Sequence, residues 1–214
     1  MLSKVIVDML IEGFWDTIYM TLAASLLAYV IGLPLGIVLV IKPVVWLNRI
    51  LGIIINILRS VPFLILVITI IPFTRWVMGT SIGTNATIVP LVVAAAPFVA
   101  RVVESSLKEV DGGVIEAAQS MGTSTFQIIY KVLLPESLPS LIVGAALAVT
   151  TILSYSALAG FVGGGGLGDI AIRYGYNRYQ SDIMLVTVAL LVVIVQILQG
   201  VGMKLARVGD RRKR

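Results

Sequence analysis

Long runs without a charged side chain constrain this sequence more than any other feature. Four of them lie at 18–41, 76–100, 137–168 and 183–203, and only Arg59 interrupts a fifth, at 50–74. A bilayer has a hydrocarbon core about 30 Å thick, which roughly 20 helical residues cross at about 1.5 Å each. A crossing segment must also satisfy its own backbone hydrogen bonds, which favours helices. The sequence therefore predicts an all-α integral membrane protein.

Five transmembrane helices are predicted, and the basic residues orient them. The helices lie at about 14–40, 50–72, 84–107, 137–158 and 183–204. An odd number of crossings places the two termini on opposite sides. One side then holds Lys42, Arg49, Lys108, Lys131, Lys204, Arg207, Arg211, Arg212, Lys213 and Arg214, and the other holds Lys4, Arg75, Arg173 and Arg178. Because basic residues concentrate on the cytoplasmic side, we predict the N-terminus outside and the C-terminus in the cytoplasm.

The composition excludes several kinds of chemistry. Cysteine and histidine are both absent, which removes disulfides, thiolate nucleophiles, the imidazole base and the two commonest zinc ligands. The sequence also lacks the GxxxxGKS/T motif for ATP. We therefore predict no enzyme activity, metal or cofactor in this chain. The first residues mix Lys4 with Asp8 and Glu12 and lack the features of a secretory signal, so we expect them in the mature protein.

Two stretches match known motifs in letters only. GGGGLG at 163–168 contains the dinucleotide pattern GxGxxG, but no strand precedes it, and a turn or flexible gate is the better interpretation. GTSIG at 79–83 has the spelling of a hydrolase nucleophile turn, but without any histidine Ser81 lacks its usual base. A serine hydrolase is therefore a weak alternative.

Residues 116–135, EAAQSMGTSTFQIIYKVLLP, form a polar interruption in an otherwise apolar chain. Helical spacing relates Val114, Ile115, Ala118 and Met121, and relates Phe126, Ile129, Tyr130 and Leu133 as one face of a second helix. Gly122 separates the two, Thr123 or Ser124 is suited to cap the second helix, and Pro135 is predicted to end it. Isolated helices this short are marginal in water. They must therefore rest on their own membrane domain, on lipid headgroups or on another protein.

The same segment resembles the signature of the inner-membrane permeases of bacterial ABC importers. Matching positions are Glu116, Ala117, Ala118, Gly122, Leu134 and Pro135, and Val132 stands where isoleucine is usual. From about residue 13 to 197 the chain resembles the methionine-importer branch of these permeases. Segments that carry this resemblance are RSVPF at 59–63, IPFTR at 71–75, AAPFVAR at 95–101, SYSA at 154–157, GGLG at 165–168 and YGY at 174–176.

The resemblance implies one transmembrane domain over residues 1–214, with a permease core at about 13–205, a cytoplasmic coupling loop at about 108–136 and a basic tail at 204–214. It implies a homodimer in the bacterial inner membrane, two ATPase subunits that carry ATP and magnesium, and a methionine-binding lipoprotein outside. No nucleic acid is implied. The expected activity is ATP-driven import of L- and D-methionine by alternating access. The alternatives are an importer for another amino acid or small solute, and an ATP-independent secondary transporter.

The resemblance also assigns a coupling role to a set of loop residues. Those expected to transmit ATPase motion are Glu116, Ala117, Ala118, Met121, Gly122, Phe126, Leu134 and Pro135. Glu116 has a second interpretation, because an acidic residue in the first turn of a helix complements the helix dipole. A glycine at the bend would let the two helices approach closely, and alanines would keep the docking face flat.

Charged and bulky residues in the predicted spans, and in the glycine-rich segment that follows the fourth span, suggest a path through the protein. A charge at the bilayer centre costs about 2.5–3.5 kcal/mol on insertion scales. Arg101 and Glu104 are three residues apart on one helix and are expected to neutralise each other. The candidates for a path or gate are Arg59, Tyr155, Leu158 and Phe161. Arg59 is suited either to meet a substrate carboxylate or to anchor the helix among lipid headgroups.

Overall fold

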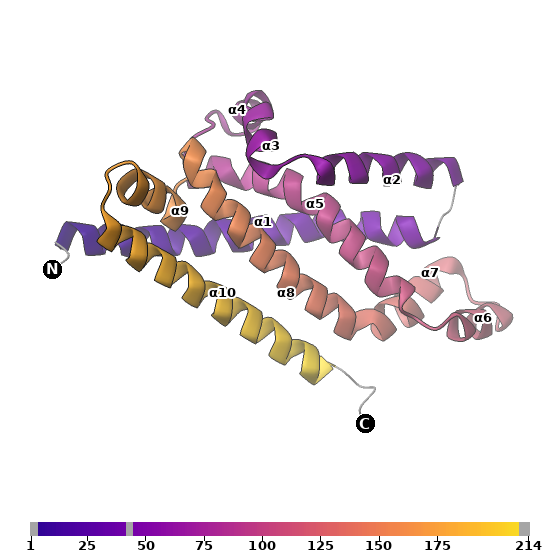
Figure 1. The fold of residues 1–214 in the computed structure, drawn as a ribbon. Helices are drawn as coiled ribbons and strands as arrows, with labels where there is room; N and C mark the ends of the chain where they lie inside the picture. Colours follow the sequence, from indigo (N-terminus) through magenta and orange to yellow (C-terminus); the bar gives the residue numbers. More distant parts are fainter. Residues whose placement is uncertain (1–3, 42–44, 210–214) are drawn as a thin grey trace.

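The computed structural model describes residues 4–41 and 45–209, and all regular structure within them is helical (Figure 1). Its long helices are α1 (Lys4–Ile41), α2 (Val45–Ser60), α5 (Thr84–Lys108), α8 (Leu134–Ala159) and α10 (Ser181–Gly209). The short ones are α3 (Phe63–Thr69), α4 (Ile71–Met78), α6 (Gly112–Ser120), α7 (Thr125–Ile128) and α9 (Gly166–Ile170). α6 and α7 lie at one end of the bundle, and α9 lies at the other. The predicted fold class is confirmed.

Four segments are long and apolar enough to cross a membrane, and they correspond to four of the five predicted spans. They are Lys4–Ile41, Thr84–Lys108, Thr125–Val162 and Ser181–Arg207. The first begins at Lys4 rather than near residue 14. Asp8 and Glu12 are exposed while Leu10 and Gly13 are buried, so this helix continues with its charges on the outer face.

The prediction of one continuous helix at 50–72 is wrong. α2 ends at Ser60, and α3 begins at Phe63 with its axis bent by 103° from that of α2. Pro62 explains the break, because a proline ring disfavours the α conformation in the residue before it. The bent pair of α2 and α3 therefore takes the place of the fifth span.

Close contact between α1 and α5 forms the centre of the bundle. A Cβ atom added to Gly32 would lie 2.7 Å from the Val99 Cβ, and one added to Gly36 would lie 2.6 Å from the Val103 Cβ. Both distances are shorter than real Cβ contacts, so only glycine allows the helices to approach this far. The small residues in α1 are therefore packing residues.

The connection between α8 and α10, which contains the predicted GGGGLG turn at 163–168, folds back onto the bundle. Two hydrogen bonds attach its backbone to the bundle. The Leu167 N–H donates to Thr17 Oγ1 at 2.8 Å, and the Gly164 carbonyl accepts from Thr87 Oγ1 at 3.0 Å. Gly163, Gly165 and Gly166 adopt positive φ angles. The predicted turn is present, but it is part of the packed core rather than a solvated loop.

Three charged residues at one end of α5 form an ion cluster that also reaches α2. Glu104 accepts from Arg101 Nη1 and from Lys108 Nζ, each at 2.6 Å. Arg101 Nη2 donates to the Gly52 carbonyl at 3.2 Å and to Asn56 Oδ1 at 2.9 Å. The predicted Arg101–Glu104 pair is confirmed. The cluster neutralises its charges locally and ties α2 to α5.

Glu104→Gln is expected to destabilise the protein by about 3 kcal/mol. The change leaves Arg101 and Lys108 without their shared carboxylate, and breaking a buried pair costs roughly 3–5 kcal/mol. The lower end of this energy range applies because the Arg101 side chain is 25 % exposed and solvent weakens the ion pair. Unfolding in mixed detergent measures the effect. The matched control is Glu12→Gln, at an exposed residue with no ion pair in 4–41 or 45–209, and an equal effect of the two changes would contradict the prediction.

Candidate functional site

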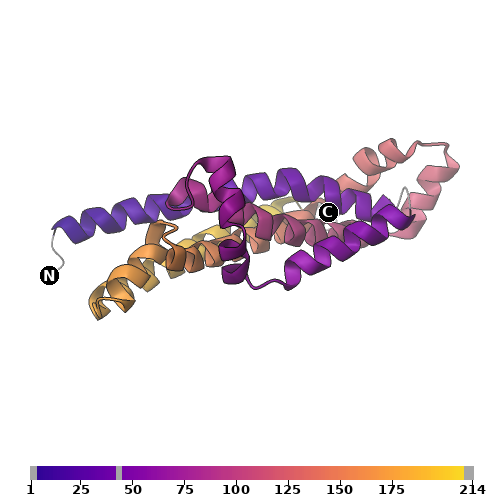
Figure 2. The same cartoon turned by 90° about the horizontal axis from the view of Figure 1, so that it is seen from above.

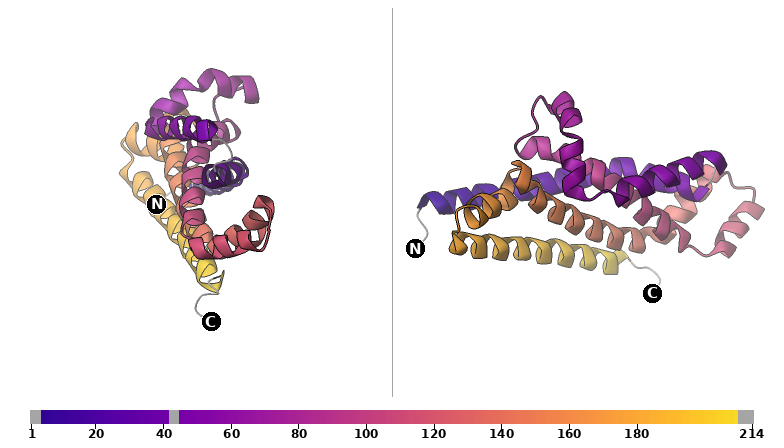
Figure 3. Two further views of the ribbon diagram at one scale, coloured as in Figure 1. Left: turned by 90° about the vertical axis from the view of Figure 1, so that its right-hand side faces the viewer. Right: turned by 45° about the horizontal axis from the view of Figure 1, so that its top comes forward.

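The two-helix hairpin predicted as the coupling loop projects beyond the bundle at the end opposite α9 (Figures 2 and 3). Asp111 caps α6 by accepting the Gly113 N–H at 2.7 Å. Ser124 caps α7 in a capping box with Gln127, which confirms one of the two predicted caps. Gly122, between the helices, has φ +74°, a conformation that L side chains rarely adopt. The hairpin is thus shaped by its own sequence.

The second helix of the hairpin does not end at Pro135, which corrects the prediction. Helical structure runs from Thr125 to Val162, through a π-helical turn at Ile129–Leu133. Pro135 is the second residue of α8, directly after this π-helical turn. The hairpin is therefore continuous with a candidate membrane-spanning helix.

The π-helical turn also changes which side chains face outward. The sequence predicts one face of Phe126, Ile129, Tyr130 and Leu133, and this prediction is wrong. Phe126 and Tyr130 are 75 % and 66 % exposed, whereas Leu133 is buried and Ile129 packs against the core. A π-helical turn contains an extra residue, so it rotates the positions that follow it.

The hairpin has one face on its own bundle and one face free of this chain. Ala118, Ile128 and Leu133 are buried in the main core cluster. Val114, Met121, Phe126 and Tyr130 are exposed. The expectation that the hairpin rests on its own membrane domain is therefore met on the inner side. On the outer side it leaves large apolar residues uncovered, which is typical of a surface that binds a partner.

Among the remaining predicted coupling residues, Glu116 and Ala117 lie on exposed positions of α6, and Leu134 is half-buried. The first turn of α6 contains no acidic residue, so Glu116 does not complement the helix dipole there. Ala118 is buried, and its carbonyl accepts from Thr123 Oγ1 at 2.6 Å. Ala118 therefore fixes the turn from inside and does not belong to the outer face.

A small cavity of about 120 Å³ lies where α2 gives way to α3. Its lining residues are Leu58, Arg59, Val61, Phe63, Ala94, Phe98 and Tyr155. The rings of Phe63 and Tyr155 stack with centroids 4.7 Å apart and planes at 3°. Two of the predicted path residues, Arg59 and Tyr155, are thus brought together from helices distant in sequence.

The other two path candidates lie elsewhere. Leu158 and Phe161 line a groove of about 620 Å³ between α8, α9 and α10, together with residues such as Met184 and Val192. Both are exposed in this chain. The four candidates therefore divide between a cavity at the helix break and an apolar groove on a different face.

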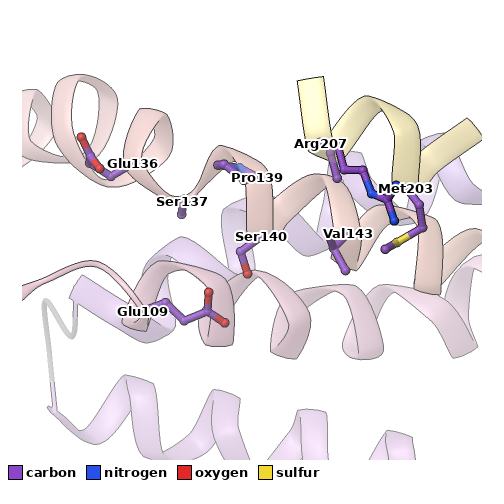
Figure 4. A pocket seen from close by; sticks show the side chains of 9 residues that line it. Glu109, Glu136, Ser137, Pro139, Ser140, Val143, Met203 and Arg207 are labelled. Carbon is purple, nitrogen blue, oxygen red and sulfur yellow. The ribbon is translucent and has the colours of Figure 1, made fainter. Parts of the chain in front are cut away.

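A third hollow, of about 340 Å³, lies beside the base of the hairpin (Figure 4). It is lined by Glu109 directly after α5, by Glu136 and Ser140 of α8, and by Met203 and Arg207 of α10. Ser140 Oγ also donates to Ser106 Oγ on α5 at 3.0 Å. Sequence reasoning did not single out this hollow, because it forms only where the ends of three helices meet.

Phe63 and Phe98 are cavity residues that sequence reasoning also missed. Each follows a proline, Pro62 or Pro97, within an apolar run. An aromatic residue directly after a proline in a transmembrane segment was the available signal. It could not show that the two rings meet at one cavity, because they come from different helices.

The fold and the projecting hairpin are those of a transport permease, and the comparison with known families agrees. Residues 32–213 match the family of binding-protein-dependent transport system inner membrane components. The chain belongs to this family and is a multi-pass membrane permease. This class is the transport component of ABC importers.

The chain is 51 % identical over 211 residues to the probable D-methionine transport system permease protein MetI of Vibrio cholerae, covering 96 % of this chain and 94 % of that protein. It is 44 % identical to the methionine import system permease protein MetP of Bacillus subtilis, over 77 % and 74 % of the two chains. A solved structure of the MetNI methionine ABC transporter, in an inward-facing conformation, superposes with a TM-score of 0.96 at 44 % identity, covering 98 % of this chain and 100 % of that one.

Proposed function

We propose that this chain is the membrane-spanning subunit of an ABC importer that moves methionine, in L and D forms, into the cell. The hairpin carries the proposal: it presents Met121, Phe126 and Tyr130 at the end of the bundle and continues directly into α8. A partner that grips this face and moves would move a transmembrane helix with it. The methionine transport proteins similar to this chain support the choice of cargo.

The proposed assembly has two copies of this chain, two ATPase subunits on the cytoplasmic side and a methionine-binding lipoprotein outside. ATP and magnesium bind the ATPase subunits, and this chain holds no cofactor and does not hydrolyse ATP. Its N-terminus lies outside and its C-terminus in the cytoplasm, as the distribution of basic residues favours. Glu116, on the exposed side of α6, is available to pair with a basic residue of the ATPase.

In the proposed cycle, ATP binding closes the two ATPase subunits and shifts the hairpins seated on them. Each shift passes through α7 and its π-helical turn into α8, because no break in the helix intervenes. The two permease copies then change which side of the membrane their shared path faces. Alternating access requires such rigid movement around a central site.

Uptake of labelled methionine into vesicles tests the proposal. Vesicles with this chain, its ATPase and the binding protein are expected to accumulate methionine when ATP is supplied. Omitting ATP or the ATPase should abolish accumulation. Uptake that persists without the ATPase would favour a secondary transporter. Preferential uptake of another amino acid by the complete complex would replace methionine as the cargo.

A further inference from the structure

The cavity at the helix break lies level with the middle of α5, one of the candidate membrane spans. Of its α5 residues, Ala94 is ten positions from Thr84 at one helix end, and Phe98 is ten positions from Lys108 at the other. At about 1.5 Å per residue each lies about 15 Å from the nearer end. Arg59 shares this cavity and therefore this depth. A headgroup anchor, the alternative role for Arg59, would require a position at the membrane surface.

Arg59 differs from the other arginine in the predicted spans. Arg101 is neutralised by Glu104 and also bonded to α2. Arg59 is exposed and has neither an ion pair nor a side-chain hydrogen bond among residues 4–41 and 45–209. An uncompensated charge at this depth is expensive, so such residues face water or a ligand. Arg59 is consequently positioned to receive an anionic group.

The surroundings of Arg59 narrow the chemistry of that group. A guanidinium presents parallel N–H donors that match the two oxygens of a carboxylate. Beside it stand Phe63, Phe98 and Tyr155, whose rings offer apolar contact and, for a thioether, a favourable sulfur–aromatic interaction. Among the residues that the structure describes, none of those lining the cavity is acidic. It is therefore suited to the carboxylate of a ligand with an uncharged, apolar body.

The cavity is large enough for one part of a small solute molecule, and its position is suited to binding one. A buried water requires roughly 10–15 Å³ of such space, so about 120 Å³ admits a carboxylate and its neighbouring atoms. Secondary transporters commonly bind substrates near the midplane, where a membrane helix is interrupted, and the same geometry is available here. Here the interruption is the 103° bend between α2 and α3.

We propose that this cavity is the transmembrane binding subsite for an apolar amino acid, with Arg59 holding the carboxylate and the aromatic residues contacting the side chain. The inference rests on the proposed function, because it takes an amino acid as the cargo. Phe63 and Tyr155 keep the site apolar on one side through their stacked rings. Ala94 also lines the cavity, with a side chain of only one methyl group.

Arg59→Gln tests the proposal in vesicles that contain the complete complex. Methionine uptake is expected to fall about tenfold or more, the size of one lost charge-assisted hydrogen bond. Arg59→Lys keeps the charge but not the paired donors, so its methionine uptake should lie between that of the parent and that of Arg59→Gln. The matched control is Arg75→Gln, on exposed α4, where Arg75 Nε donates to Ser81 Oγ at 3.1 Å, and its uptake should equal that of the parent.

The outcomes separate this inference from the proposed function. A parent complex that takes up no methionine would overturn the proposed function. Parent uptake that Arg59→Gln leaves unchanged would overturn the subsite alone. Co-purification of the ATPase shows that each variant complex has assembled.

A second measurement does not require any change of Arg59. The sequence contains no cysteine, so Ala94→Cys places a single thiol of this chain in the cavity wall. Methionine is expected to slow labelling of that thiol by a small thiol reagent several-fold in the working complex. The control Gly200→Cys, at an open position on α10, should label at the same rate with and without methionine. Equal labelling of Ala94→Cys in both conditions would overturn the proposal.

Discussion

Gly122→Arg is expected to abolish ATP-driven methionine uptake while the protein still inserts in the membrane. Gly122 has φ +74°, where a side chain strains the backbone by about 1–2 kcal/mol. The space around it is open, because within 4–41 and 45–209 no atom other than those of its chain neighbours lies within 4 Å of an added Cβ. The arginine therefore fits this subunit but alters the turn and adds a charge beside Met121, which belongs to the proposed docking face. Uptake into vesicles measures the effect.

Gly122→Asn is the matched control, because asparagine tolerates the left-handed conformation better than other side chains. It is expected to keep most of the uptake. Crosslinking from Met121→Cys to the ATPase, with and without Gly122→Arg, reports whether docking itself is lost. Normal uptake by Gly122→Arg, or absence of any crosslink in the parent, would contradict the coupling role of the hairpin.

Gly168→Ala is expected to prevent stable folding of the connection between α8 and α10 and to lower the amount of protein in the membrane several-fold. An added Cβ at Gly168 would overlap the backbone of Ala157 in α8. Backbone atoms cannot rotate away as a flexible side chain does, so α9 must shift. Overpacking of this kind typically costs 1–3 kcal/mol. The shift would also disturb the Leu167 N–H bond to Thr17.

Gly200→Ala provides the comparison for Gly168→Ala. Gly200 lies in α10, where no atom of the described residues outside its own helical turn lies within 4 Å of an added Cβ, and alanine is favoured over glycine in helices by about 1 kcal/mol. Its membrane level and thermal stability in detergent should match or exceed those of the parent. Equal stability of Gly168→Ala and the parent would show that the contact between α8 and α9 is not as tight as the structure indicates.

Much of the hairpin was predictable because its signals are local. Asp111, Ser124 and Gly122 act on the backbone within a few residues, and the observed caps and turn follow from these residue types. The end of the second helix was not predictable. Proline usually stops a helix, but here a π-helical turn precedes Pro135 and the chain passes directly into α8.

The residues of the candidate site were also only partly predictable from the sequence. Arg59 was a candidate from sequence because a charge in an apolar run is costly wherever the helix lies. Its neighbours Phe63, Phe98 and Tyr155 could not be grouped with it, since they come from α3, α5 and α8. Leu158 and Phe161, which are close to Tyr155 in sequence, lie on a separate groove.

The sequence by itself determined that this chain crosses a membrane as helices, because hydropathy and backbone hydrogen bonding act on each segment independently of the others. It also determined the hairpin signature and the Arg101–Glu104 pair, which depend on spacing along one helix. Only the tertiary structure decided that α2 and α3 form a bent pair beside α5 and α8, and that Arg59 lines one cavity with three aromatic residues. Which residues of separate helices lie together depends on how those helices pack. The spacing of residues along the chain does not directly specify that packing.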